Sequence, residues 1–259
     1  MFRSGAASTT PSTEPITLTE AALNKTLNFL CAGAAQGLVK ALQAPFAAQT
    51  GATLQGRFGA VGAMKEALLA GEPCDVMIVT GSMVDALCAD GLLQASSRVA
   101  LGRVLTGVAV RNGTALPDIS HGAALKATLL AADALYFPDA QRATAGIHFA
   151  KVLQQLGIFD ALQPRFRTYP AGAIAMREMA ASSAGYAVGC TQISEIMYTP
   201  GVQLVGALPA EFELATAYTA AISANTANTA SANLAAQFCA LLASPEAQAL
   251  CLAGGFMVG

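Results

Sequence analysis

The chain contains 259 residues, of which 54% are hydrophobic and 12% are charged, and its net charge at pH 7 is −2. This balance excludes the electrostatic attraction on which binding to nucleic acid or to an anionic membrane depends. No apolar run approaches the roughly 20 residues that cross a bilayer, so we expect no membrane segment. A chain of this length buries a substantial core, and we predict a globular α/β protein with two lobes.

The N-terminal segment, residues 1–25, has the length of a secretory signal but not its composition. Ser, Thr, Pro and Glu dominate it, and it contains no apolar stretch. We therefore predict a flexible extension over residues 1–25. For the chain as written, this predicts a cytoplasmic location; a periplasmic location would follow if a natural signal peptide had been removed.

The segment from residue 27 to residue 79 predicts strand, glycine-rich turn and helix twice in succession, followed by a third strand. The predicted strands are 27–32, 53–58 and 74–79, and the turns are GAAQG (33–37) and GAVGA (59–63). Small residues at both turns let a ligand approach the backbone N–H groups that open each helix, where the helix dipole favours an anion. The two turns therefore predict a cleft that holds a small anion.

The remainder of the chain predicts a second set of alternating strands and helices. The predicted strands are 103–113, 133–139, 185–189, 202–206 and 217–223, and the predicted helices are 123–131, 147–162, 172–181, 231–242 and 245–253. Two halves with two crossings between them predict a two-lobe α/β fold with a hinged ligand cleft. We assign residues 26–105 and 214–259 to lobe 1 and residues 106–213 to lobe 2.

Three runs of sequence carry a resemblance to a known family: AGEPCDVMI, TAGIHFAKVLQQLGIFD and the C-terminal SPEAQ followed by GGF. In their order and spacing they resemble the molybdate-binding subfamily of type 2 periplasmic solute-binding proteins, over roughly Leu27 to Gly259. The resemblance implies the two-lobe periplasmic-binding-protein fold, with the ligand held in the cleft. It does not identify the ligand.

The positions that bind molybdate in the resembled subfamily differ in this chain. Ala34 stands where the first helix start carries a Ser, and Ala60-Val61-Gly62 replaces a cluster of Ser. Val188 and Thr191 replace a Tyr and an Asp, and Pro170 removes a backbone N–H donor. Each unmet hydrogen bond of a desolvated oxyanion costs about 1–3 kcal/mol. The resemblance thus implies an anion site that is poorly suited to molybdate.

Two arginines are candidates to replace the missing donors. Arg142 lies in the loop that opens a predicted helix, and Arg57 lies at the end of a predicted strand. A guanidinium holds a carboxylate through two parallel hydrogen bonds, which favours a carboxylate ligand. For Arg57, a solvated charge at a strand end is an equal alternative.

The other candidate ligand contacts are neutral. They are backbone groups or side chains at predicted helix starts: Ala34, Ala35, Gln36, Ala60, Val61, Gly62, Thr144, Ala145, Tyr169, Ala171, Thr191 and Gln192. For Gln36, Thr144, Thr191 and Gln192 the alternative is an ordinary N-terminal helix cap.

His148 and Cys190 are the candidate catalytic residues. His148 falls in the first turn of a predicted helix that points towards the cleft, where a neutral imidazole would act as a base. Cys190 lies at a strand-to-helix junction, where a helix N-terminus lowers the pKa of a thiol. The alternatives are a histidine in the core or at a cap and a small packing residue. The six cysteines show no metal-binding spacing, so we expect reduced thiols, no metal and no cofactor.

Two functions remain open from the sequence. The resemblance implies, for this divergent group, an isomerase that interconverts cis- and trans-aconitate, a small tricarboxylate, by an allylic proton shift. The alternative is the solute-binding protein of an ABC importer for molybdate or another small anion. Both need a small anionic ligand and neither needs nucleic acid; a permease is expected as a partner only under the alternative.

Overall fold

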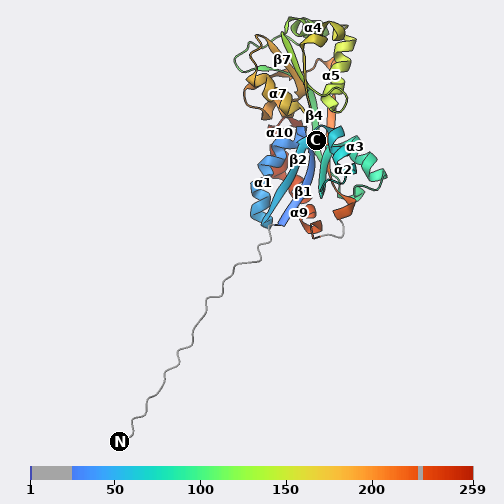
Figure 1. Ribbon diagram of the computed structural model, residues 1–259, viewed down its shortest axis with the longest axis vertical. Helices are drawn as coiled ribbons and strands as arrows, with labels where there is room; N and C mark the ends of the chain where they lie inside the picture. Colours follow the sequence, from blue (N-terminus) through green and yellow to red (C-terminus); the bar gives the residue numbers. More distant parts are fainter. Residues whose placement is uncertain (2–24, 227–229, 259) are drawn as a thin grey trace.

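The computed structural model describes Met1, residues 25–226 and residues 230–258. Figure 1 shows two lobes stacked along the long axis and joined where the long strand β4 passes from one to the other. The predicted extension over residues 1–25 lies outside the described residues, apart from Met1 and Lys25. None of the described helices is long and apolar enough to cross a membrane.

Lobe 1 is a mixed sheet with helices packed around it. Its strands are β1 (Lys25–Ala32), β2 (Ala52–Gly59), β3 (Val76–Thr80), β9 (Ala215–Ile222), the first half of β4 (Val99–Arg111) and β10 (Phe256–Met257). Its helices are η1 (Gly33–Ala35), α1 (Gln36–Thr50), α2 (Val61–Leu69), α3 (Gly81–Ala89), α9 (Ala232–Leu242) and α10 (Pro245–Ala253). β1 runs parallel to β2 and β3, whereas β9 runs antiparallel to β3 and β4.

Lobe 2 is built around the second half of β4. Its further strands are β5 (Ala134–Pro138), β6 (Phe166–Tyr169), β7 (Ala187–Gln192) and β8 (Val202–Ala207). Its helices are α4 (Gly122–Ala131), α5 (Thr144–Gln155), α6 (Phe159–Leu162), α7 (Gly172–Ala181) and α8 (Ile193–Tyr198). Short 3₁₀ turns complete the two lobes: η2 (Ala95–Ser97), η3 (Gln163–Arg165), η4 (Ala210–Phe212) and η5 (Ala224–Thr226).

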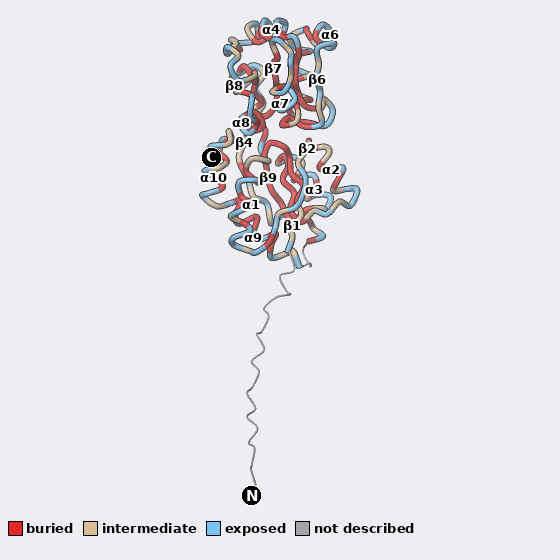
Figure 2. Tube along the Cα trace, turned by 60° about the vertical axis from the view of Figure 1, so that its left-hand side comes forward, coloured by how far each residue is buried: buried red, intermediate tan, exposed pale blue. Residues whose placement is uncertain are grey.

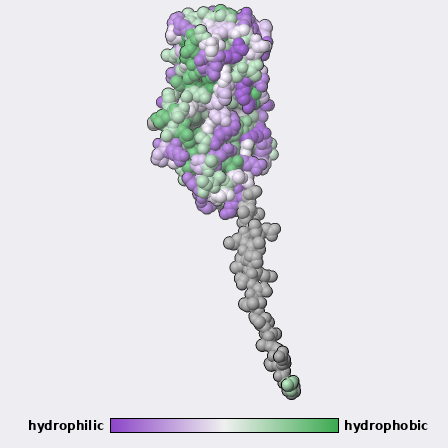
Figure 3. All heavy atoms as spheres, turned by 90° about the vertical axis from the view of Figure 1, so that its left-hand side faces the viewer, coloured by the Kyte–Doolittle hydropathy of each residue, from purple (hydrophilic) through white to green (hydrophobic). Residues whose placement is uncertain are grey.

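The apolar core is divided at the point where β4 changes partners. Up to Leu105, β4 pairs with β9, and from Thr106 onward it pairs with β7 and β8. One core cluster draws on residues 27–104 and 218–256, and the others draw only on residues 108–208. Figure 2 shows the corresponding buried segments in each lobe, while the molecular surface in Figure 3 mixes apolar and polar side chains. Our lobe boundaries, with residues 26–105 and 214–259 in lobe 1 and residues 106–213 in lobe 2, stay a prediction.

The strand registers decide where a ligand site can form. Ala32 pairs with Gly59, so the parallel strands β1 and β2 end level and their following helices start side by side. In lobe 2, Pro138 pairs with Tyr169, so β5 and β6 also end level. Loops at the carboxyl ends of parallel strands are where open α/β sheets bind ligands. Each lobe therefore presents two such loops.

Two predicted elements differ in the structure. The single helix predicted for residues 147–162 is interrupted, because Gly157 takes a left-handed conformation with φ of +67° and ends the run begun by α5. The strand predicted for residues 185–189 continues to Gln192, and α8 starts only at Ile193. The later start of α8 places Glu195 in its first turn.

Candidate functional site

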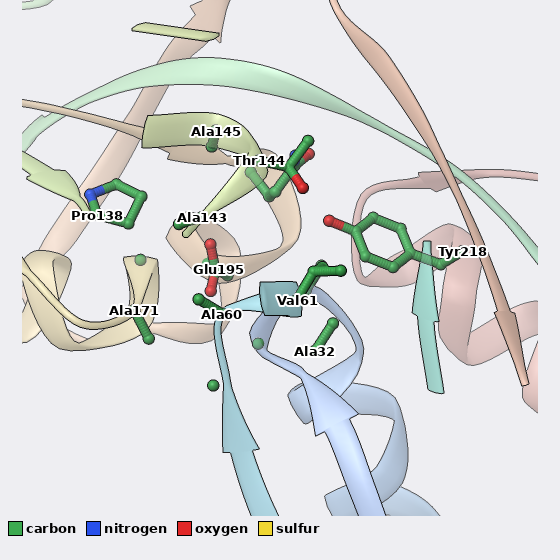
Figure 4. A pocket seen from close by; sticks show the side chains of 15 residues that line it. Ala32, Ala60, Val61, Pro138, Ala143, Thr144, Ala145, Ala171, Glu195 and Tyr218 are labelled. Atoms are coloured by element: carbon green, nitrogen blue, oxygen red, sulfur yellow. The ribbon is translucent and has the colours of Figure 1, made fainter. Parts of the chain in front are cut away.

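A small cavity lies where loops from both lobes meet, and in this conformation its volume is about 20 Å³, room for about one water molecule. Small and apolar residues make up most of its wall, as Figure 4 shows. Its lining residues are Ala32, Gly33, Ala34, Gly59, Ala60, Val61, Pro138, Ala143, Thr144, Ala145, Ala171, Gly172, Gln192, Glu195 and Tyr218. We call the space that these residues line the interlobe cavity. Because most of them have short side chains, backbone groups face much of the ligand space.

Helix N-termini surround the interlobe cavity without side-chain caps. The N-cap residues of α2, α5, α7 and α8 make no side-chain capping hydrogen bond, and neither does the N-cap of η1. Thr80, His121 and Ser244 cap α3, α4 and α10, whereas α1, α6 and α9 also start without a side-chain cap. Two of these N–H groups already have partners, since Ala173 of α7 donates to Glu195 and Gly62 of α2 donates to the Arg142 carbonyl. An N–H group that has no partner at a helix start is an orphan donor in the field of the helix dipole. The convergence of such groups on one cavity is the geometry of an anion site.

Glu195 is the carboxyl group of this cavity. Its side chain is only 6% exposed, and it accepts hydrogen bonds from the Thr191 hydroxyl at 2.5 Å and from the backbone N–H of Ala173 at 3.3 Å. Burial raises the pKa of Glu195, and these hydrogen bonds oppose the rise. A carboxyl with a raised pKa inside a cleft is a candidate for proton transfer.

Two glycines make room for the Glu195 carboxyl. A Cβ built at Gly33 or at Gly172 would overlap its oxygens, so the starts of η1 and α7 approach it more closely than any side chain allows. Glu195 is therefore held between a lobe 1 turn and a lobe 2 helix. Movement of the two lobes would act directly on it.

Tyr218 and Gln192 bring further polar groups into the cavity. Tyr218, on β9, is 2% exposed, and Figure 4 shows its hydroxyl pointing into the ligand space. Burial raises the pKa of Tyr218, and the charge of Glu195 adds to the rise. Gln192 contacts the Thr216 hydroxyl through Nε2 at 3.3 Å, while its buried Oε1 has no partner among the described residues. An unmet buried polar group costs about 1–3 kcal/mol, which a ligand hydrogen bond would recover.

Comparison with known proteins identifies the family. The model of the family "Bacterial extracellular solute-binding protein" matches residues 27–257. The chain belongs to this family. Among curated proteins, the chain is 29% identical to an aconitate isomerase from Pseudomonas sp over 231 residues, which is 86% of this chain and 84% of the relative.

Solved structures confirm the predicted two-lobe fold of this chain. The periplasmic molybdate-binding protein of Azotobacter vinelandii matches with a TM-score of 0.72 and 22% identity, covering 90% of this chain and 99% of that one. The sulfate-binding protein of Mycobacterium tuberculosis H37Rv matches with a TM-score of 0.68 and 16% identity, covering 90% and 86%. At these identities the likeness establishes the fold alone.

The structure brings about half of the ligand residues predicted from the sequence to the cavity. Those that line it are Ala34, Ala60, Val61, Thr144, Ala145, Ala171 and Gln192. Thr191 stands behind the wall and bonds Glu195. Ala35, Gln36, Gly62 and Tyr169 are not in the wall. Ala35 is buried in the core of lobe 1, Gln36 and Tyr169 line other surface pockets, and the Gly62 N–H donates to the Arg142 carbonyl. All of these roles stay predictions.

The two predicted arginine clamps do not reach the cavity. Arg57 pairs with Glu72 at 2.9 Å on an exposed edge of lobe 1. Arg142 directs its Nε to Glu66 at 3.6 Å, and both side chains are more than half exposed. The backbone carbonyl of Arg142 also accepts from the N–H of Gly62 at 3.2 Å. Arg142 therefore links the lobes at the surface instead of contacting the ligand space.

The predicted catalytic residues also point elsewhere. His148 lies outside the cavity wall, and its Nε2 hydrogen-bonds the carbonyl of Phe212 at 2.7 Å. Cys190 is packed in the core of lobe 2, where burial raises the pKa of its thiol. A thiol whose pKa is raised by burial stays protonated near neutral pH and is therefore a poor nucleophile. Among the described residues, no cluster of His, Cys, Asp and Glu side chains is arranged to hold a metal ion.

Sequence reasoning missed Glu195 and Tyr218. The sequence holds a signal for Glu195, because the run TQISE sets an acid four residues after a hydroxyl at a strand-to-helix junction. Starting the helix at Cys190 hid this relationship. The sequence around Tyr218 gives no comparable indication, because an aromatic residue in the apolar strand AYTAAI is typical of a residue buried in the core.

Proposed function

We propose that this solute-binding protein is an isomerase that interconverts cis- and trans-aconitate in the interlobe cavity. The observation that carries the proposal is the buried Glu195 carboxyl among uncapped helix N-termini. A site that only holds a fully ionised oxyanion gains nothing from a carboxyl, because like charges repel. A carboxyl whose pKa is raised suits proton abstraction from a carbon acid.

The relative from Pseudomonas sp supports the substrate. It is an aconitate isomerase by its printed name, and the similarity extends over most of both chains. Aconitate carries three carboxylates, and the starts of α2, α5 and η1, which have no side-chain cap, offer backbone donors from both lobes. The Ala173 N–H of α7 already bonds Glu195. Free backbone donors stabilise charge that spreads onto carboxylates in a transition state.

The reaction needs one proton to change places. In our proposal the Glu195 carboxylate removes a proton from the methylene carbon, so that a C–H bond breaks and an O–H bond forms. The electron pair delocalises over the allylic carbons and the adjoining carboxylates. A proton then adds to the far carbon, where a new C–H bond forms and the double bond shifts. No atom or electron is gained or lost overall.

Contacts between the lobes support a reaction that excludes water. The Gly62 to Arg142 hydrogen bond and the Arg142 to Glu66 ion pair join α2 of lobe 1 to the loop before α5 of lobe 2. A closed cleft strengthens electrostatic stabilisation and shields an anionic intermediate from solvent. We propose that the lobes open to admit the substrate and close for proton transfer.

The family itself favours a second candidate function. As a member of the extracellular solute-binding proteins, the chain fits delivery of a small anion to an ABC permease. The fold neighbours bind molybdate and sulfate by their printed names. The family description also supports a periplasmic location for either function, in place of the cytoplasmic location expected from the composition of residues 1–25.

A single experiment separates the two functions. The full chain is mixed with cis-aconitate, and proton NMR follows the vinyl signals of the two isomers. In parallel, thermal unfolding is measured with molybdate, sulfate, citrate and both aconitates. We expect enzyme-dependent approach to the isomer equilibrium from either side and stabilisation by aconitates. Stabilisation by molybdate or sulfate alone, without turnover, would overturn the isomerase proposal in favour of anion transport.

A further inference from the structure

A second group in the cavity is able to move a proton. The Tyr218 hydroxyl points into the ligand space, and no hydrogen bond to another described residue holds it. Its ring is buried and packs against Phe256 with centroids 6.1 Å apart, which fixes the phenol in place. A phenol hydroxyl that opens onto the cavity can donate a hydrogen bond to a ligand or accept one from it.

We propose that Tyr218 is the acid that delivers the proton to the far carbon of the allylic anion, while Glu195 removes the proton from the methylene. This proposal rests on the proposed isomerase function. Tyr218 comes from β9 of lobe 1 and Glu195 from α8, so the two groups enter the cavity from separate elements, as Figure 4 shows. In this arrangement each group serves a different end carbon of the allylic system.

The electrostatic coupling of the two residues fits a sequential transfer. Burial and the Glu195 charge raise the pKa of Tyr218, so the phenol keeps its proton at neutral pH. When Glu195 takes the substrate proton, it loses its negative charge. The contribution of that charge to the raised pKa of Tyr218 is then lost. The phenol then becomes a stronger acid at the moment when a strongly basic carbanion needs a proton.

The cycle closes without any further reactant. Proton delivery breaks the Tyr218 O–H bond and forms the new C–H bond, leaving a phenolate beside a protonated Glu195. The proton passes from Glu195 to the Tyr218 oxygen, directly or through water admitted when the lobes open. Both residues then return to their starting forms.

Removal of the Tyr218 hydroxyl tests the proposal. We expect Tyr218→Phe to lower kcat by about 10²–10³-fold while KM for aconitate changes less than about threefold. Tyr136→Phe is the matched control, because Tyr136 is a buried tyrosine of lobe 2 outside the cavity wall. Its kcat should stay at the wild-type value.

An isotope readout separates proton delivery from a structural role. In D₂O the Tyr218 hydroxyl carries deuterium, so the first turnover of the wild type should place one deuterium in the new methylene group, seen by NMR. Retention of the substrate's own hydrogen, or a Tyr218→Phe variant with wild-type kcat, would overturn the role of Tyr218 and leave the isomerase intact. A wild type without turnover would overturn both proposals.

Discussion

The Thr191 hydroxyl donates a hydrogen bond to the Glu195 carboxylate at 2.5 Å, one helical turn before it, and both side chains are buried. Thr191 is the last-but-one residue of β7, and Glu195 lies in the first turn of α8. The strand end thus fixes the orientation of the carboxyl that faces the cavity. The hydrogen bond favours the ionised carboxyl, which is the form that a base requires.

Removal of this hydroxyl changes the pH dependence of turnover. The hydrogen bond from Thr191 lowers the pKa of Glu195, so Thr191→Val raises it further. Because the base acts when ionised, we expect the acid limb of the kcat/KM profile to move to higher pH. Thr128→Val is the control, since the Thr128 hydroxyl bonds the Asp118 carbonyl in lobe 2, away from the cavity. Identical acid limbs for wild type and Thr191→Val would contradict the role of this bond.

We expect the surface ion pair between Arg142 and Glu66, which joins the two lobes, to contribute little to the affinity for aconitate. Arg142 and Glu66 have side chains 57% and 58% exposed, and exposed pairs are worth about 0–1 kcal/mol. We expect Arg142→Ala and Glu66→Ala to weaken aconitate binding by less than about fivefold each in calorimetry. Arg57→Ala should leave binding unchanged, because Arg57 pairs with Glu72 within lobe 1. A loss of a hundredfold or more in Arg142→Ala alone would restore Arg142 as a ligand clamp.

The buried Glu195 makes stability depend on pH. Burial raises its pKa above the ordinary value of 4.5, so the folded protein binds this proton more tightly than the unfolded chain does. The stabilisation is therefore complete below about pH 4.5 and is lost as the pH rises through the folded-state pKa. We expect Glu195→Gln to raise Tm at pH 8 relative to wild type, with a smaller difference at pH 4.

An exposed carboxyl provides the comparison for this stability effect. Glu213, in the connection to β9, is exposed, and Glu213→Gln should leave the pH dependence of Tm unchanged. If Glu195→Gln were less stable than the wild type at pH 8 and equal at pH 4, an ionised Glu195 would stabilise the fold, which our account excludes.

The sequence predicts the fold of this protein better than its site. Gly and Ala at residues 33–35 and 59–60, between apolar strands, are enough to predict two helix starts at one sheet edge, because parallel strands of equal register end together. Backbone donors follow from this arrangement without any knowledge of side chains. The cavity residues Ala34, Ala60 and Val61 were therefore within reach of sequence reasoning.

The side chains that carry chemistry depend on tertiary contacts that no local pattern contains. Arg142 lies in a cleft-side loop as predicted, but Glu66 of the opposite lobe draws its guanidinium to the surface. His148 lies near a helix start, yet its ring turns to the Phe212 carbonyl. Tyr218 reaches the cavity only because β9 returns to lobe 1 between β3 and β4. These pairings join residues distant in the chain.

The most direct test of the account is the turnover of Glu195→Gln with aconitate. Glutamine keeps the shape of the side chain but cannot accept the substrate proton, so we expect kcat to fall by about 10²–10⁴-fold. Aconitate should still raise the Tm of the variant, because the uncapped helix N-termini remain. A Glu195→Gln variant that isomerises aconitate at the wild-type rate would contradict the assignment of Glu195 as the base.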